Sequence, residues 1–260
     1  MNISLAAEPI FSISGLTITN SAFTAVLVSF ALIIIAAVLR VGLLTIPKRA
    51  QTLAEMIYDG LLGITKNVIG REDVAQELFP FIITAFFFIV ISNWSGLIPG
   101  FSSILHGETP VFRAPTSDLN TVIALALCSV AYVQYLGFKY RGIKGYLSTF
   151  FNFSGPIYFA VGIIELISEI MRPISYSFRL FGNVFAGEVL LAVIIFLNST
   201  FLPFTPIIPL PFYALELFVG VIQALVFCFL TIVFASIAIS DHGEPHAEVP
   251  LEAVAVQTSK

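Results

Sequence analysis

Charged and amide side chains recur in a stretch that is otherwise apolar enough to lie in a lipid bilayer. The stretch runs from residue 155 to residue 198 and contains Glu165, Glu169, Arg172, Arg179, Asn183 and Glu188. A charged side chain inside a membrane costs at least about 2.5–3.5 kcal/mol on insertion scales, so these residues are functional candidates. Carboxylates can bind and release protons, whereas an arginine keeps its proton and can only attract an anion or block a proton wire.

The spacing of these residues places most of them on one side of a helix. At about 100° per residue, one polar stripe contains Glu165, Glu169, Arg172, Tyr176, Arg179 and Asn183. Glu188 falls about 180° from Arg179 and about 13 Å farther along the axis. In the last apolar stretch, Glu216 and Gln223 lie one heptad apart on one face. Carboxylates thus approach Arg179 from both ends, which predicts two aqueous half-paths separated by a positive barrier.

Structural roles are the alternatives for these side chains. Arg172 or Arg179 could form an ion pair with a neighbouring glutamate that only stabilises the fold. Glu216 could extend to the outer membrane interface. Asn183 and Gln223 could simply form hydrogen bonds between helices.

The composition indicates a helical integral membrane protein. Of the 260 residues, 58% are hydrophobic and 11% are charged, against roughly 25% charged in soluble domains. The formal net charge of −4 gives no indication of a nucleic-acid partner. The sequence contains neither the GxxxxGK[ST] phosphate loop nor the HExxH zinc motif. We therefore expect no enzyme activity of the chain alone, no cofactor and no metal.

Five stretches reach the length of a membrane-spanning helix, about 20 residues. They cover residues 21–45, 77–98, 118–138, 156–198 and 212–240, within a membrane domain of residues 21–241. Asp118 can cap the third helix, and Pro173 either bends the fourth or divides it in two. Residues 47–70 predict an amphipathic helix, either in the membrane interface or packed on the other helices. Residues 99–117 and 139–155 are expected to be loops, and residues 242–260 a mobile tail.

Basic residues predict the orientation. They follow the first and third spans, at Arg40, Lys48, Arg49, Lys66, Arg71, Lys139, Arg141 and Lys144, whereas the loop after the second span has only Arg113 and residues 199–211 have none. Because cytoplasmic loops are enriched in lysine and arginine, the segment of residues 1–20 is expected outside and the tail in the cytoplasm. This clean pattern, together with an N-terminus unlike a transit peptide, favours a bacterial plasma membrane.

Several motifs resemble subunit a of F-type ATP synthases. They are RLFGNVFAGE at residues 179–188, Pro173–Ser175, NWSGLIP at 93–99, PTSDLN at 115–120 and Gln223 with Ala224. The resemblance covers about residues 20–241 and implies an all-α membrane protein of five transmembrane helices plus the interfacial helix. It also implies that the last two helices form a long tilted hairpin against a rotating ring of c subunits. The implied partners are this c ring, the peripheral-stalk b subunits, the remaining ATP synthase subunits and the lipid bilayer.

The resemblance also implies roles for individual residues. Arg179 corresponds to the essential arginine that faces the ring carboxylate. The implied route from the outside contains Glu188, Glu216, Asn183, Gln223, Asp118 and Asn120. The implied cytoplasmic route contains Ser175, Glu169, Glu165 and Arg172. Some members carry histidine where this chain has Glu188 or Glu216.

A self-contained secondary ion transporter is the alternative function, although this sequence lacks the internal repeat that is common in such proteins. A structural anchor is a third possibility, but it would not require Glu188 and Glu216. The choice between H⁺ and Na⁺ depends on the ring and stays open.

Overall fold

The computed structural model describes residues 8–13, 16–42, 49–98, 105–106, 109–150, 156–201 and 208–240. Its helices are α1 (Asn20–Val41), α2 (Arg49–Ile69), α3 (Glu72–Gly96), α4 (Leu119–Phe150), α5 (Pro156–Phe201) and α6 (Leu210–Ile239), with a short 3-10 helix, η2 (Pro115–Ser117). Five of these helices, all except α2, are long and apolar enough to cross a membrane. The predicted all-α membrane fold is confirmed.

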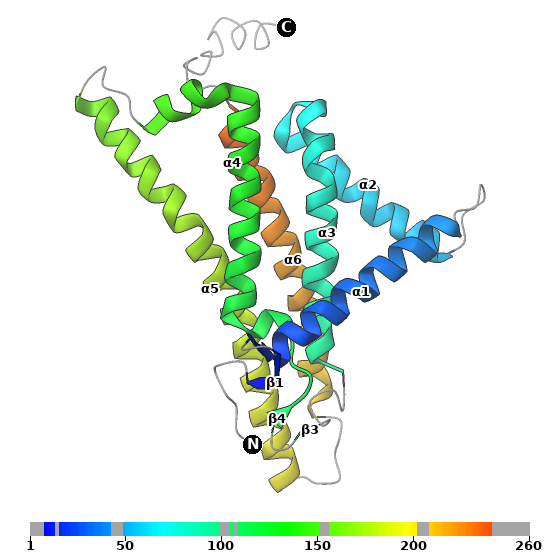
Figure 1. The fold of residues 1–260 in the computed structure, drawn as a ribbon. Coiled ribbons are helices and arrows are strands. Elements are labelled where there is room, and N and C mark those ends of the chain that lie inside the picture. The colour runs from blue at the N-terminus through cyan, green and yellow to red at the C-terminus, as the bar shows by residue number, and fades with distance from the viewer. Residues whose placement is uncertain are drawn as a thin grey trace, which may run out of the picture.

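Two short hairpins lie near the start of α1 (Figure 1). Strands β1 (Pro9–Ile13) and β2 (Leu16–Thr19) pair antiparallel, as do β3 (Leu105–His106) and β4 (Thr109–Pro110). The first hairpin lies within the N-terminal segment of residues 1–20, for which the sequence analysis predicted no secondary structure. The predicted tail, residues 242–260, lies outside the described residues.

Helices α3, α4 and α6 form the centre of the bundle, and α5 crosses them at an angle (Figure 1). Leu78, Ile82 and Ile89 on α3 are fully buried, at helical spacing. Helix α1 leans across α3 and exposes Phe30, Ile33 and much of its remaining apolar surface. Exposed apolar faces of this kind are suited to contact with lipid.

Helix α5 is continuous over 46 residues, with Pro173 in its interior. It is therefore one helix of about 69 Å, and the alternative of two elements divided at Pro173 is wrong. Proline lacks the N–H that would bond the carbonyl four residues earlier. Ser177 Oγ donates to the carbonyl of Pro173 at 2.8 Å, which is a local hydrogen bond within the helix.

The expected loop at residues 139–155 is helical as far as Phe150. Helix α4 changes direction at Gly142, whose φ of 75° and ψ of 158° lie outside the helical region. Glycine accepts this backbone conformation without a steric penalty. Beyond the change of direction, the Tyr146 ring packs edge-on against Phe138, with ring centroids 4.7 Å apart. The prediction failed because this helical turn is stabilised by aromatic packing rather than by a long apolar run.

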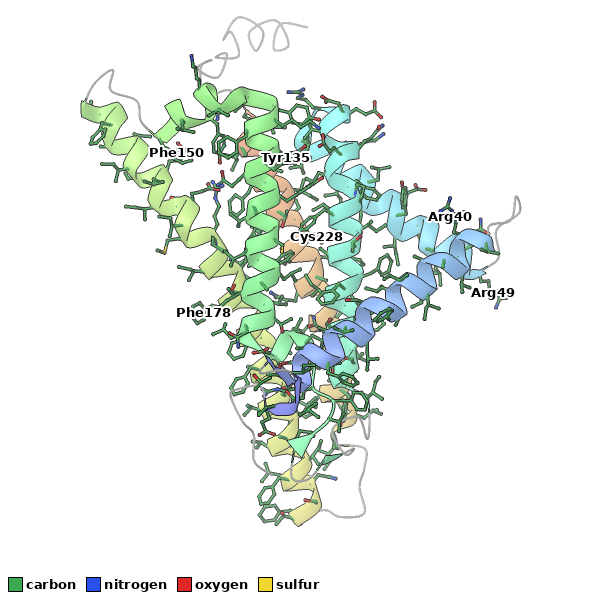
Figure 2. The ribbon with its side chains drawn as sticks, in the orientation of Figure 1. Arg40, Arg49, Tyr135, Phe150, Phe178 and Cys228 are labelled. Atoms are coloured by element: carbon green, nitrogen blue, oxygen red, sulfur yellow. The ribbon has the colours of Figure 1, made fainter. Side chains whose placement is uncertain are left out.

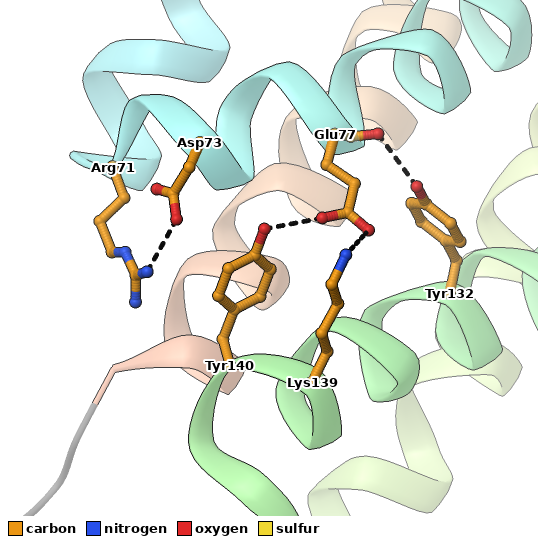
Figure 3. A network of polar contacts seen from close by, with 6 residues as sticks. All are labelled: Arg71, Asp73, Glu77, Tyr132, Lys139 and Tyr140. Carbon is orange, nitrogen blue, oxygen red and sulfur yellow. Dashed lines mark hydrogen bonds and ion pairs between the residues drawn. The ribbon is translucent and has the colours of Figure 1, made fainter.

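A polar network joins the start of α3 to the middle of α4 (Figure 3). The Glu77 carboxylate accepts hydrogen bonds from Lys139 Nζ at 2.6 Å and from Tyr140 Oη at 2.7 Å, while Tyr132 Oη donates to the Glu77 carbonyl at 3.0 Å. Arg71 lies over the Tyr140 ring, 4.9 Å from its centroid. Helix α3 therefore begins at Glu72, before the predicted start at residue 77, because its first turns are held by polar contacts.

Helix α2 packs its C-terminal half on α3 and α6, where Leu61, Thr65 and Ile69 are buried. Its N-terminal half exposes apolar side chains, among them Leu53 and Met56. The packing of the C-terminal half agrees with the alternative in which the helix lies on the other helices, and placement of the exposed half in the membrane interface stays a prediction.

We expect Gly137→Ala to destabilise the protein. A Cβ at this position would lie 2.6 Å from Cε2 of Tyr146, so the ring that closes the bend of α4 would have to move. Overpacking of this kind typically costs about 1–3 kcal/mol. Thermal unfolding in detergent measures the change. Gly60→Ala is the control, because nothing lies within 4 Å of its Cβ and alanine is the better helix former. Equal melting temperatures for Gly137→Ala and the native chain would contradict this account.

Candidate functional site

One face of α5 is exposed along the helix and contains Arg179. Ser175 and Asn183 lie on this face, as does Phe178, which is 61% exposed and points away from the other helices (Figure 2). Arg179 Nη2 donates to Ser175 Oγ at 3.4 Å. Within the described part of the chain, Arg179 forms no ion pair. An arginine on an apolar, membrane-length helix is costly unless it is compensated, so Arg179 is a functional candidate.

A second polar cluster lies between α4, α5 and α6. Arg172 Nη1 and Glu169 Oε2 are 2.5 Å apart, and both side chains are only 12% exposed. Gln134 on α4 donates to the Glu169 carboxylate, and the Arg172 guanidinium lies 4.2 Å from the centroid of the Phe234 ring. Glu169, Arg172 and Phe234 line a narrow crevice together with Tyr176. The structural ion pair is therefore present at Arg172, but not at Arg179.

The single polar stripe expected on α5 is thus divided between two environments. Arg172 and Tyr176 turn toward the bundle, whereas Ser175 and Arg179 are exposed. The residues keep the helical alignment that their spacing predicted, but their burial differs because α5 crosses its neighbours at an angle. The side of the helix that is covered therefore changes along its length. Glu165 is half-buried one turn before Glu169.

A third group of polar side chains lies where α5 meets α6 and α3. Asn183 Nδ2 donates to Gln223 Oε1 at 2.7 Å, so the predicted interhelical hydrogen bond is present. Both residues line a hollow of about 270 Å³ that also contains Glu216 and Asn93. Its interior offers about 10 Å³ to the centre of a water molecule, which is close to the space that one water needs. Glu216 and Gln223 share a face, as their heptad spacing predicted.

Asn93 joins three elements at this hollow. Its Oδ1 accepts from Thr116 Oγ1 at 2.6 Å and its Nδ2 donates to the carbonyl of Gly220 at 3.1 Å. The neighbouring Trp94 donates from Nε1 to the carbonyl of Leu217 at 3.1 Å. Sequence reasoning placed Asn93 only at the end of a span and did not recognise it as a connection between α3, η2 and α6. The sequence signal that could have identified this role is an amide side chain near the end of an apolar run.

Glu188 and Glu216 lie on different sides of α5. The Glu216 carboxylate lies against Gly187, where a side-chain Cβ would overlap it. Glu188 instead faces Ser117 and the Arg113 guanidinium, and its Oε1 lies near Gly96 on α3. The expectation that Glu188 faces away from the surface of Arg179 is confirmed.

Asp118 is buried and acts as a cap. Its Oδ1 accepts from the backbone N–H of Asn120 at 3.2 Å, and its Oδ2 accepts from Ser21 Oγ at 2.9 Å. The predicted cap of α4 is confirmed, and Asn120 itself is exposed. No group of three or more histidine, cysteine, aspartate or glutamate side chains within the described residues is arranged to hold a metal.

The ATP synthase A chain family matches residues 19–236, which is most of the chain. The chain belongs to this family. An ATP synthase subunit a from Syntrophobacter fumaroxidans is 37% identical over 201 residues, covering 76% of this chain and 75% of the relative. The ATP synthase subunit a from Desulforamulus reducens is 36% identical and covers 77% of this chain and 71% of the relative. The one from Gloeobacter violaceus is 35% identical and covers 77% of this chain and 76% of the relative.

Membership in the ATP synthase A chain family assigns the general role. The protein is an integral membrane component of the Fo sector, and it takes part in proton transport coupled to ATP synthesis. The exposed arginine and the two polar clusters belong to this membrane subunit.

We expect Asn93→Ala to destabilise the end of the bundle where α3, η2 and α6 meet. The Thr116 hydroxyl and the Gly220 carbonyl would both lose a buried partner, and each unsatisfied group costs about 1–3 kcal/mol. Thermal unfolding in detergent should show a lower melting temperature for Asn93→Ala. Asn120→Ala is the matched control, since an exposed asparagine changes stability by no more than about 0.5 kcal/mol. Equal effects of the two substitutions would contradict the bridging role of Asn93.

Proposed function

We propose that this subunit forms two offset proton half-paths beside a ring of c subunits, with Arg179 as the barrier between them. Protons from outside reach a ring carboxylate by way of Glu188, Glu216, Asn183 and Gln223. After nearly a full turn of the ring they leave through the cytoplasmic cluster, which contains Ser175, Glu169, Glu165 and Arg172. Each neutralised ring carboxylate can face lipid at lower cost than a charged one.

One observation carries this proposal: Arg179 is exposed on α5 between two polar clusters that face the bundle. Glu188 lies nine residues after Arg179, about 13 Å along the helix, and Arg172 lies seven residues before it, about 10 Å away. The guanidinium therefore lies between the two clusters in depth. Because it keeps its proton, it attracts an ionised ring carboxylate but does not relay protons.

The exposure of Arg179 also favours this function over a self-contained ion transporter. A transporter that works alone would keep such a charge within its own bundle, paired or facing a water-filled cavity. Here the exposed face of α5 combines Ser175 and Arg179 with apolar side chains such as Phe178. We infer that α5 and α6 form a tilted hairpin whose exposed face lies against the c ring.

The proposal also assigns the entrance residues, the b-subunit contacts and the orientation of the chain. Asp118 and Asn120 lie at the outer entrance, where Asp118 holds the start of α4 rather than carrying protons. The peripheral-stalk b subunits contact other faces of this chain in the assembled ATP synthase. The basic ends of α2 and α4 face the cytoplasm of a bacterial cell, and the hairpin of β1 and β2 lies outside its plasma membrane.

We expect Arg179→Ala to abolish ATP-driven acidification of inverted vesicles that contain the assembled complex. Without the guanidinium nothing holds the ionised ring carboxylate or separates the half-paths. Loss of the separation between the half-paths is measured as passive proton leak through complexes stripped of the catalytic sector. Arg49→Ala is the control, because Arg49 is exposed at the start of α2. Normal pumping by Arg179→Ala, with normal assembly, would overturn the barrier role.

We expect Gly187→Ala to impair proton pumping while leaving assembly intact. The added methyl group occupies the space of the Glu216 carboxylate. The end of a glutamate side chain can move at little cost, so the carboxylate leaves the hollow instead of the helix unfolding. A reduction of acidification on the order of tenfold corresponds to about 1.4 kcal/mol at the slow step. Gly63→Ala on α2, whose Cβ meets nothing within 4 Å, should pump normally. Native pumping by Gly187→Ala would exclude Glu216 from the route in this position.

A further inference from the structure

Arg113 lies two residues before η2, and its guanidinium donates two hydrogen bonds to Ser117, an arrangement called here the Arg113 fork. Its Nε donates to Ser117 Oγ at 2.9 Å and its Nη2 donates to the Ser117 carbonyl at 3.3 Å. Ser117 itself is fully buried. A guanidinium that donates to two atoms of one residue fixes both the position and the orientation of that residue.

Helix α5 packs on η2, and Glu188 Oε1 and Ala114 both lie next to Gly96 on α3. Ser117 and Arg113 on this segment both interact electrostatically with the Glu188 carboxylate. The Ser117 hydroxyl accepts from Arg113 and donates to the carbonyl of Ala114 at 3.0 Å. Because a serine hydroxyl has one proton, it can serve either Ala114 or Glu188 at a given moment. Among the described residues, Glu216 on α6 is a second charged group that interacts with Glu188, and Gly96 on α3 lies close to its Oε1. Within this part of the chain, Arg113 is the positive charge that acts on the Glu188 carboxylate.

The segment that carries Arg113 is held from the side of α1. The backbone N–H of Arg113 donates to Thr24 Oγ1 at 3.4 Å, and Thr24 is 1% exposed. Ser21 binds Asp118 directly after η2. Thr116 binds Asn93 on α3. Contacts to α1 and α3 thus hold the segment in place, so the position of the Arg113 side chain is set by the packing of the bundle.

We propose that Arg113 is a positioning residue for proton loading, because it holds the Ser117 hydroxyl and a positive charge against Glu188. This rests on the proposed function, in which Glu188 belongs to the outer route. The charge of Arg113 keeps the Glu188 carboxylate directed at η2, and the Ser117 proton turns to Glu188 when the carboxylate is ionised. When Glu188 accepts a proton, the hydroxyl turns back to the Ala114 carbonyl. Only the proton taken up from outside moves onward, so no further reactant is needed.

The test uses assembled complexes in inverted vesicles, stripped of the catalytic sector, with proton conduction driven by a potassium diffusion potential. The variants are Glu188→Gln, Glu188→Asp, Arg113→Gln, Arg113→Lys, Ser117→Ala and the double variant Arg113→Gln/Glu188→Asp. Arg71→Gln is the matched control, since it removes an exposed guanidinium at the other end of α3. The amount of this subunit in the membrane is measured for every variant.

We expect Arg113→Gln to slow conduction on the order of tenfold, as for loss of a charged hydrogen-bonding partner. Arg113→Lys should recover part of the rate, because lysine keeps the charge but not the fork. Arg113→Gln should have a smaller effect in the Glu188→Asp background, where the shorter carboxylate no longer reaches Ser117. A purely structural role predicts equal effects in both backgrounds and no recovery by lysine, and that result would overturn the inference.

The outcomes separate this inference from the proposed function. Native conduction by Glu188→Gln would remove Glu188 from the route and overturn the proposed function itself. Impaired Glu188→Gln with native Arg113→Gln would overturn only the positioning role. If Arg113→Gln fails to assemble, Ser117→Ala decides the question. An assembled Ser117→Ala that conducts at the native rate would also overturn the positioning role.

Discussion

The length of α5 is the constraint on which the rest of the structure depends. A helix of about 69 Å is more than twice as long as the hydrocarbon core is thick, and it crosses α4 and α6 at an angle (Figure 1). Its early turns therefore face α4 and α6 at Glu169 and Arg172, and its later turns face η2 and α3 at Glu188. The slope separates two polar clusters in depth and leaves Arg179 exposed between them.

Compensation of buried polar groups organises the outer end of the molecule. A polar group within a membrane is costly unless it has a partner. Asn93 bonds to Thr116 and to the Gly220 carbonyl, and Asp118 bonds to Ser21 and to the first turn of α4. These bonds connect the loop before α4 to three helices. Short-range polar contacts thus hold the place where protons are proposed to enter, while Arg179 has only the Ser175 hydroxyl, at 3.4 Å, as a hydrogen-bond partner within the described chain.

Helix length and charge spacing allowed much of the fold to be predicted. Five apolar runs and the heptad from Glu216 to Gln223 needed no tertiary information, because a span requires about 20 apolar residues and a helix repeats every 3.6. The failures came where packing competes with these rules. The turn of α4 at Gly142 contains too few apolar residues for a span, yet Tyr146 packs on Phe138 and keeps it helical. Pro173 was compatible with a break, but α5 continues through it.

The sequence by itself determined the class of protein and its chemical groups, because membrane insertion depends on local hydrophobicity and an arginine is charged in any context. It also determined that Glu188 and Arg179 point to opposite sides of one helix. Only the tertiary structure decided which charges are compensated. Arg172 and Arg179 are seven residues apart and nearly aligned on α5, but one forms an ion pair with Glu169 and the other is exposed. The difference depends on the angle at which α5 crosses α4 and α6, and side-chain contacts across three helices set that angle.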